Sequence, residues 1–127
     1  MTKITVTLHG QDVQADLLNP EVTERFENGF DAVLEEFNSV AANKEIAGSK
    51  GIRLQCQAVI DYVTDIFGAD GAKKVFGEET DLLTCLDILG EMTDLYPTQV
   101  IPKIREKKSV FEKKLAERRK SVTPDEV

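Results

Sequence analysis

The feature that most constrains the fold is a long run of apolar residues at helical spacing in the first third of the chain. Asn19-Pro20-Glu21 precedes the run, and Asn as N-cap with Pro at the first helical position is a strong helix start. The sequence therefore predicts a helix from about residue 20 to residue 43, at the centre of the core. Steps of three and four residues separate its apolar positions: Val22, Phe26, Phe30, Val33, Leu34, Phe37, Val40 and Ala41.

Residues 3–17 alternate between apolar and polar side chains, which predicts a β-hairpin. The turn is expected at His9-Gly10-Gln11-Asp12. Two strands alone are marginal in water, so the hairpin must lie on the helices or pair its open edge with another chain. Its apolar face comprises Ile4, Val6, Leu8, Val13, Ala15 and Leu17.

Three further helices are predicted before residue 98: residues 52–67, a short one over about 70–76, and one from about 81 that stops at Pro97. Gly68 and Gly77 each follow a Phe and are placed to end a helix. The expected fold is mainly α (α+β), with an N-terminal β-hairpin followed by four or five helices, the last a basic amphipathic helix.

The charge of −7 is unevenly divided along the chain. Residues 1–102 carry 18 acidic and 7 basic side chains, whereas residues 103–120 carry 9 basic and 3 acidic ones. We expect residues 1–97 to form the hairpin and a compact helical body, 98–120 the basic helix, and 121–127 a flexible tail. The acidic body disfavours nucleic acid as a partner.

The basic helix bears a thin apolar seam, and three interpretations of it stay open. It packs on its own acidic body, binds an acidic or helical partner protein, or contacts nucleic acid or a membrane surface. The predicted partner-binding residues are Ile101, Ile104, Phe111 and Leu115 on the seam, with Ile4 and Val6 on the hairpin. Self-association is also expected, because hairpin edge and seam both need covering.

Residues that carry chemistry are few, which predicts no enzyme and no cofactor. The single histidine, His9, stands in a predicted turn without a partner for acid-base catalysis. Asp61, Asp65 and Asp70 are interpreted as a solvated helix face and not a metal site. Cys56 and Cys85 fall on apolar stripes and are expected to be reduced core residues.

The segment FGADGAKKVFG lacks the spacing of a phosphate-binding loop. No apolar run is long enough to span a membrane, and the first residues lack a secretion signal. These observations predict a cytoplasmic protein with no membrane partner.

Two segments, KITVTLHGQDVQADLLNPEVTERFE and CQAVIDYVTDIFGADGAKKVFG, together resemble small tail-module proteins of phages and prophages of Gram-positive bacteria. Such proteins begin with a short hairpin and often carry an FG-x-G-x-A-x-x-hydrophobic-FG segment; the resemblance spans roughly residues 3–95. It implies a tail assembly chaperone, or a similar protein, that binds the helical tape-measure protein in the host cytoplasm. The family supplies no catalytic residues.

Two functions therefore follow from the sequence as expectations. The first is a non-enzymatic assembly chaperone or adaptor that binds a helical phage structural protein. The alternative is a small acidic inhibitor that occupies the nucleic-acid groove of a host enzyme, through Glu24, Glu27, Asp31 and Glu35.

Overall fold

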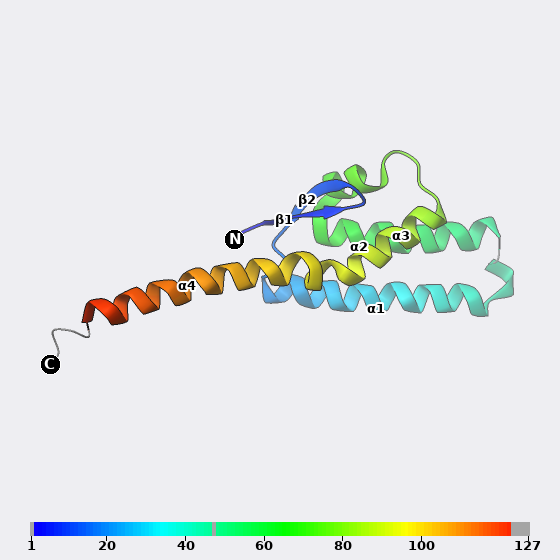
Figure 1. Cartoon of the computed structure of the whole chain (residues 1–127). Coiled ribbons are helices and arrows are strands. Elements are labelled where there is room, and N and C mark those ends of the chain that lie inside the picture. Colours follow the sequence, from blue (N-terminus) through cyan, green and yellow to red (C-terminus); the bar gives the residue numbers. More distant parts are fainter. Residues whose placement is uncertain (1, 47, 123–127) are drawn as a thin grey trace.

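A computed structural model describes residues 2–46 and 48–122 of the chain. The protein is mainly helical with an N-terminal antiparallel hairpin, as the sequence predicts (Figure 1). The elements in order are β1 (Ile4–Leu8), β2 (Gln11–Ala15), α1 (Pro20–Ala42), the 3-10 turn η1 (Lys44–Ile46), α2 (Ser49–Phe76), α3 (Leu82–Leu95), the π-helical segment η2 (Tyr96–Val100) and α4 (Ile101–Val122). Three helical segments follow the hairpin instead of four or five, because α2 is one helix with a kink and because α3, η2 and α4 run on without a break.

The hairpin turns over two residues, fewer than the four expected. His9 and Gly10 both have positive φ, at 51° and 75°, which is the conformation of a type I′ turn and matches the twist of the two strands. Val6 pairs with Val13 and Leu8 with Gln11. The apolar face predicted from the alternation is buried throughout: Ile4, Val6, Leu8, Val13, Ala15 and Leu17.

Helix α1 begins where the sequence predicts, since the Asn19 side chain accepts a hydrogen bond of 2.9 Å from the backbone N–H of Glu21. It packs along α2. The two helices approach closely at Gly29, where a Cβ would lie 2.6 Å from Cδ1 of Tyr62. The Tyr62 hydroxyl donates to the carbonyl oxygen of Phe26 at 2.8 Å, which ties the helices together beside this contact.

Helix α2 is interrupted at Gly68, whose φ of 83° and ψ of 169° lie outside the helical region. The predicted helix end at Gly68 and the short helix that follows it are therefore both present, as two parts of α2 joined at a kink. Gly77, with φ of 74°, ends the second part. Its backbone N–H donates to the carbonyl oxygen of Lys73 at 2.8 Å, as expected of a glycine that caps a helix.

The prediction that a helix stops at Pro97 is wrong. The chain widens into the π-helical turn of η2, in which the N–H of Ile101 donates to the carbonyl of Tyr96, five residues back. A wider turn accommodates a proline ring and its missing N–H, so the helix continues. The boundary expected between residues 97 and 98 thus falls inside a continuous helix. Of the predicted flexible tail, residues 123–127 lie outside the described part of the chain.

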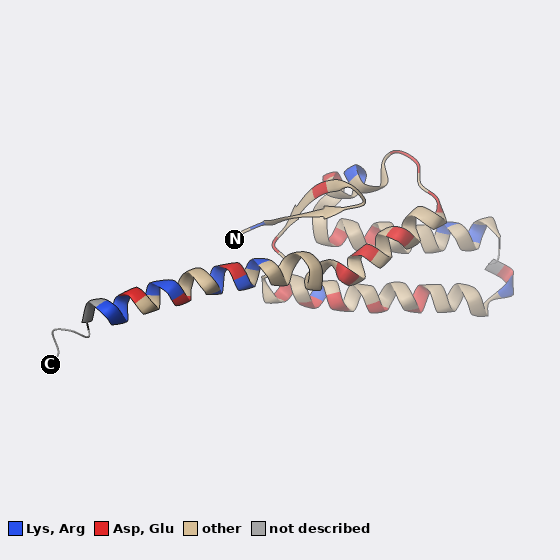
Figure 2. Ribbon diagram, in the orientation of Figure 1, with Lys and Arg blue, Asp and Glu red and all other residues tan. Residues whose placement is uncertain are grey.

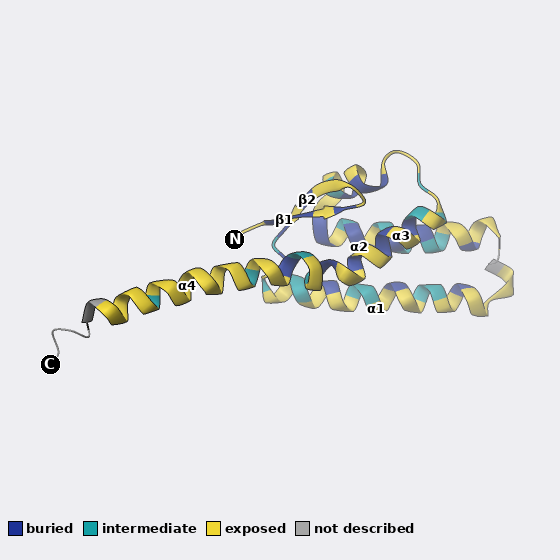
Figure 3. Cartoon of the chain, viewed as in Figure 1, coloured by how far each residue is buried: buried dark blue, intermediate teal, exposed yellow. Residues whose placement is uncertain are grey.

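One core unites the inner face of the hairpin with α1, α2, α3 and η2 (Figure 3). Cys56 and Cys85 are both buried in it with free thiols, as predicted. Burial in this core raises the pKa of the Cys85 thiol to about 11. The Tyr96 hydroxyl donates to the carbonyl of Leu17 at 2.6 Å, and so anchors the start of η2 beneath the hairpin.

Candidate protein-binding surface

Helix α4 extends out of the body as an arm (Figure 1). It packs against η2, from which it continues, and against no other described element to a comparable extent. None of its described residues is buried, whereas α3 in the same continuous helix buries five: Cys85, Ile88, Leu89, Met92 and Leu95. The arm is largely exposed beyond its first turns (Figure 3); among residues 105–120 only Leu115 is half-buried.

The four predicted contact residues of α4 lie on one face of the arm. At 100° per residue, Ile101, Ile104, Phe111 and Leu115 fall within a sector of about 80°. We call these four residues the apolar stripe. Phe111 is 60% exposed and Ile101 36% exposed, while Ile104 and Leu115 are half-buried. An aromatic ring this exposed is available to a second protein.

Lysines and arginines recur along the whole arm with three glutamates among them, and acidic residues predominate on the body (Figure 2). Because the arm projects, its positive charge is held away from the acidic helices. This structure therefore does not support the interpretation that α4 packs on its own acidic body.

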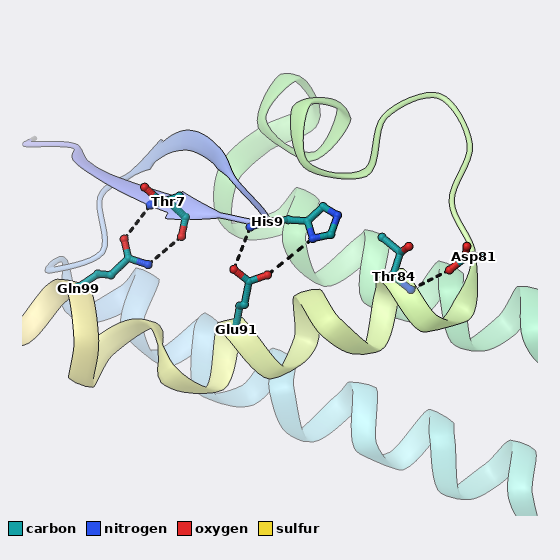
Figure 4. Close-up of polar contacts among 6 residues, drawn as sticks. All are labelled: Thr7, His9, Asp81, Thr84, Glu91 and Gln99. Atoms are coloured by element: carbon teal, nitrogen blue, oxygen red, sulfur yellow. Dashed lines mark hydrogen bonds and ion pairs between the residues drawn. The ribbon is translucent and has the colours of Figure 1, made fainter.

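The sequence predicts an open hairpin edge. Side chains of the continuous helix formed by α3, η2 and α4 close this edge over part of its length (Figure 4). The Gln99 side chain pairs with both backbone groups of Thr7: Oε1 accepts from the N–H at 2.7 Å and Nε2 donates to the carbonyl at 2.8 Å. One oxygen of Glu91 accepts from the N–H of His9 at 3.0 Å, and the other lies 3.8 Å from Nδ1 of that histidine.

Two predicted contact residues are corrected by their burial. Ile4 is 8% and Val6 2% exposed, because both point inward from β1. Their side chains are part of the core and are not available to a partner. The helix residues that close the edge, Glu91 and Gln99, were missed from the sequence, since no local pattern relates them to a strand more than 80 positions away.

The residues weighed for other chemistry form ordinary surface contacts. His9 occupies the turn as predicted and contacts Glu91. Asp61 accepts from Nε2 of Gln57 at 2.7 Å, and Asp65 forms an exposed ion pair of 3.7 Å with Arg25. Among residues 2–46 and 48–122, no three His, Cys, Asp or Glu side chains gather as they would around a metal ion.

The remaining pKa shifts belong to structural contacts. Burial raises the pKa of the Tyr62 hydroxyl, and burial also raises the pKa of Tyr96. The Asp81 carboxylate accepts from the N–H of Thr84 at 2.8 Å as the N-cap of α3 (Figure 4), and this hydrogen bond lowers the pKa of Asp81. These shifts describe helix ends and packing, not a catalytic centre.

No helix in the described part of the chain has the length and apolar character needed to cross a membrane. In comparisons with known proteins, one family model matches, over residues 9–122; it describes a family of unknown function (DUF6673). No curated protein and no solved structure matches the chain.

Proposed function

Since the chain belongs to the DUF6673 family, whose function is unknown, we propose that it is a non-enzymatic module that binds a helical partner protein along α4. The observation that carries the proposal is the apolar stripe on a projecting helix, with Phe111 60% exposed. A helix of this kind lacks the tertiary packing that stabilises most protein helices. A partner helix packed on the stripe supplies that packing.

Physical magnitudes favour a protein over other occupants of the stripe. Burying a Phe, Leu or Ile side chain contributes about 1.5–3 kcal/mol, so a partner that covers three of them gains several kcal/mol before its costs. Flanking lysines and arginines favour a partner with acidic positions beside its own apolar face. A bare phosphate backbone has no apolar surface to place against Phe111.

For the partner we propose an extended helical structural protein of the phage tail, such as a tape-measure protein, bound in the host cytoplasm. The support is the sequence resemblance to tail-module proteins together with the projecting stripe. An assembly chaperone must cover apolar helical surface on its client until assembly, and a helix presented on an arm can lie along such a surface.

A second candidate, the acidic inhibitor of a nucleic-acid enzyme, is supported by one face of α1. Glu24, Glu27, Asp31 and Glu35 are all exposed. At 100° per residue they fall within a sector of about 80°, so a basic groove could meet all four. This face lies on the body, so its substitution separates the two candidates.

The test is coexpression with a phage tape-measure protein, followed by purification of the complex. We expect copurification and a gain in solubility of the tape measure. Phe111→Ser with Leu115→Ser should abolish both. The matched control is Val110→Ser, because Val110 is 48% exposed on the same helix but points away from the stripe.

If the control fails as completely as the stripe variant, the stripe is not the contact surface. The acidic face of α1 can be tested by reversing Glu24, Glu27, Asp31 and Glu35 to Lys. If this variant no longer copurifies with the tape-measure protein while the stripe variant still does, the acidic face of α1 is the contact surface instead.

A further inference from the structure

The outer edge of β1 is closed along one half and open along the other. In this register the pairs Leu8–Gln11, Val6–Val13 and Ile4–Ala15 exchange hydrogen bonds across the hairpin. The backbone groups of Thr5 and Thr7 therefore face outward. Gln99 takes both groups at Thr7, whereas no hydrogen bond from the described residues reaches the outward N–H and C=O of Thr5.

The continuous helix of α3, η2 and α4 packs against β1 through α3 and η2, but not to a comparable extent through α4. It runs opposite to β1, since Glu91 meets His9 and Gln99 meets Thr7 (Figure 4). One helical turn beyond Gln99, Lys103 faces the same space between helix and strand as Thr5. A groove of about 530 Å³ lies between strand and helix at this level. Its lining includes Lys3, Thr5, Leu18, Lys103, Ile104 and Lys107.

The groove joins positive charge to an apolar floor. Lys3, Lys103, Lys107 and Lys108 line it with a single acidic side chain, Glu106. Leu18 is 47% exposed, and Ile104 is half-buried. A ligand that satisfies the site must therefore bring acidic groups, apolar groups, and a donor with an acceptor for the backbone of Thr5.

We propose that this groove is a docking site for an acidic, extended segment of a partner protein, which adds to β1 as a third strand at Thr5. An extended peptide offers a carbonyl to the N–H of Thr5 and an N–H to its carbonyl, as in strand addition to a sheet edge. Alternate side chains of the segment face the lysines and the apolar floor. Gln99 ends the added strand at Thr7, so the segment is short.

An inorganic anion fits the same groove less completely. It neutralises the lysines and accepts from the N–H of Thr5, but it leaves the carbonyl unpaired and the apolar floor uncovered. The docking site does not depend on the function proposed for α4, since only Ile104 belongs to both surfaces. The Phe111 and Leu115 variants should leave it intact.

The experiment measures fluorescence anisotropy of a labelled six-residue peptide that alternates Val and Glu, titrated with the full chain. Lys103→Glu with Lys107→Glu should weaken binding at least tenfold. The matched control is Lys113→Glu with Lys114→Glu, which makes the same charge change further along the same helix. All four lysines are exposed, and circular dichroism verifies that both double variants are folded.

Two further peptides, methylated in the two alternate registers, separate strand addition from charge attraction. N-methylation of alternate backbone nitrogens keeps the charges and removes the hydrogen bonds, so at least one of the two methylation registers should lose tenfold or more. Equal binding of all three peptides, or equal losses in both lysine variants, would overturn the proposal. Displacement of the peptide by single-stranded oligonucleotide of the same charge, at equal concentration, would show a general polyanion site instead.

Light scattering tests whether a second copy of this protein occupies the groove. If the chain dimerises and the peptide dissociates the dimer, the groove holds a second copy of this protein, and the proposal of a different partner fails.

Discussion

Helices α3 and α4 are two halves of one continuous helix with opposite surroundings. The inward residues of α3 meet α2 and the hairpin, and five of them are buried. The apolar residues of α4 have similar spacing, but none of the described ones is buried. The comparison teaches that an apolar stripe indicates a surface to be covered, and that its place in the fold decides whether the protein's own body covers it.

The largest expected effect comes from truncating the same residue type in both halves. Leu95→Ala removes a side chain that is 0% exposed, which should lower the free energy of unfolding by about 2–5 kcal/mol. Leu115→Ala should lower it by less than about 1 kcal/mol, because Leu115 lies on the arm. Urea denaturation followed by circular dichroism measures both. Equal losses would mean that the arm packs on the body in solution.

A glycine pair sharpens the comparison between a packed face and an open one. Gly29→Ala should destabilise the protein by about 1–3 kcal/mol, since the added Cβ would lie 2.6 Å from the Tyr62 ring. Gly90→Ala in α3 meets nothing within 4 Å and should stabilise its helix by about 0.5–1 kcal/mol. The two melting temperatures should therefore move in opposite directions. A neutral Gly29→Ala would show that α1 can shift away from α2.

The closed half of the β1 edge can be opened at Gln99. Gln99→Ala removes both hydrogen bonds to Thr7. The free energy of unfolding should fall by no more than about 0.5–1.5 kcal/mol for each bond. Amide hydrogen exchange by NMR should accelerate at Thr7. The N–H of Thr5 is the internal control, because it faces outward already and should exchange rapidly in both proteins. Unchanged exchange at Thr7 would contradict the closure by Gln99.

A pH dependence is also expected, and it originates in the buried core. The pKa of Cys85 rises from 9.0 to about 11 on folding, so between these values the unfolded chain releases a proton that the folded chain keeps. The free energy of unfolding should therefore fall as the pH rises from 9 towards 11. The slope is at most about 1.4 kcal/mol per pH unit for one group.

Cys85→Ala serves as the reference for this measurement, made by urea denaturation at pH 8 and pH 10. The variant should be less stable overall, because removal of the buried thiol leaves a cavity. Its free energy of unfolding should nevertheless fall less steeply over this pH range. Tyrosines contribute chiefly above pH 10 and are common to both proteins. An equally steep fall in the variant would contradict a role for the thiol.

Local patterns predicted most of the fold. The alternation over residues 3–17 identified the buried face of the hairpin, and Asn19-Pro20 located the start of α1. Pro97 led to the prediction of a helix end that is not there. The cost of a proline inside a helix depends on whether the helix can widen at that point, and the packing of η2 decides whether it can. The number of separate helices was too high for this reason and because α2 spans the kink at Gly68.

The candidate surfaces were only partly predictable. Spacing identified the stripe of α4, including Phe111, because it depends on residues close in sequence. The hairpin contacts were assigned wrongly, since Ile4 and Val6 were treated as both core and contact. Closure of the edge by Gln99, and the groove beyond it, depend on contacts across more than 90 positions, which no local pattern contains.

The π-helical turn at η2 carries one residue more than an α-helical turn while the helix continues. Each residue of an α-helix advances by 100°, so loss of one residue between Ile104 and Phe111 would rotate the rest of the arm by about 100° relative to its first turns. A π turn has more residues per turn than an α-helix, so loss of one residue within η2 that restores an α-helical turn would rotate the arm far less. The place at which a residue is lost thus decides whether Phe111 and Leu115 keep the face that they share with Ile104.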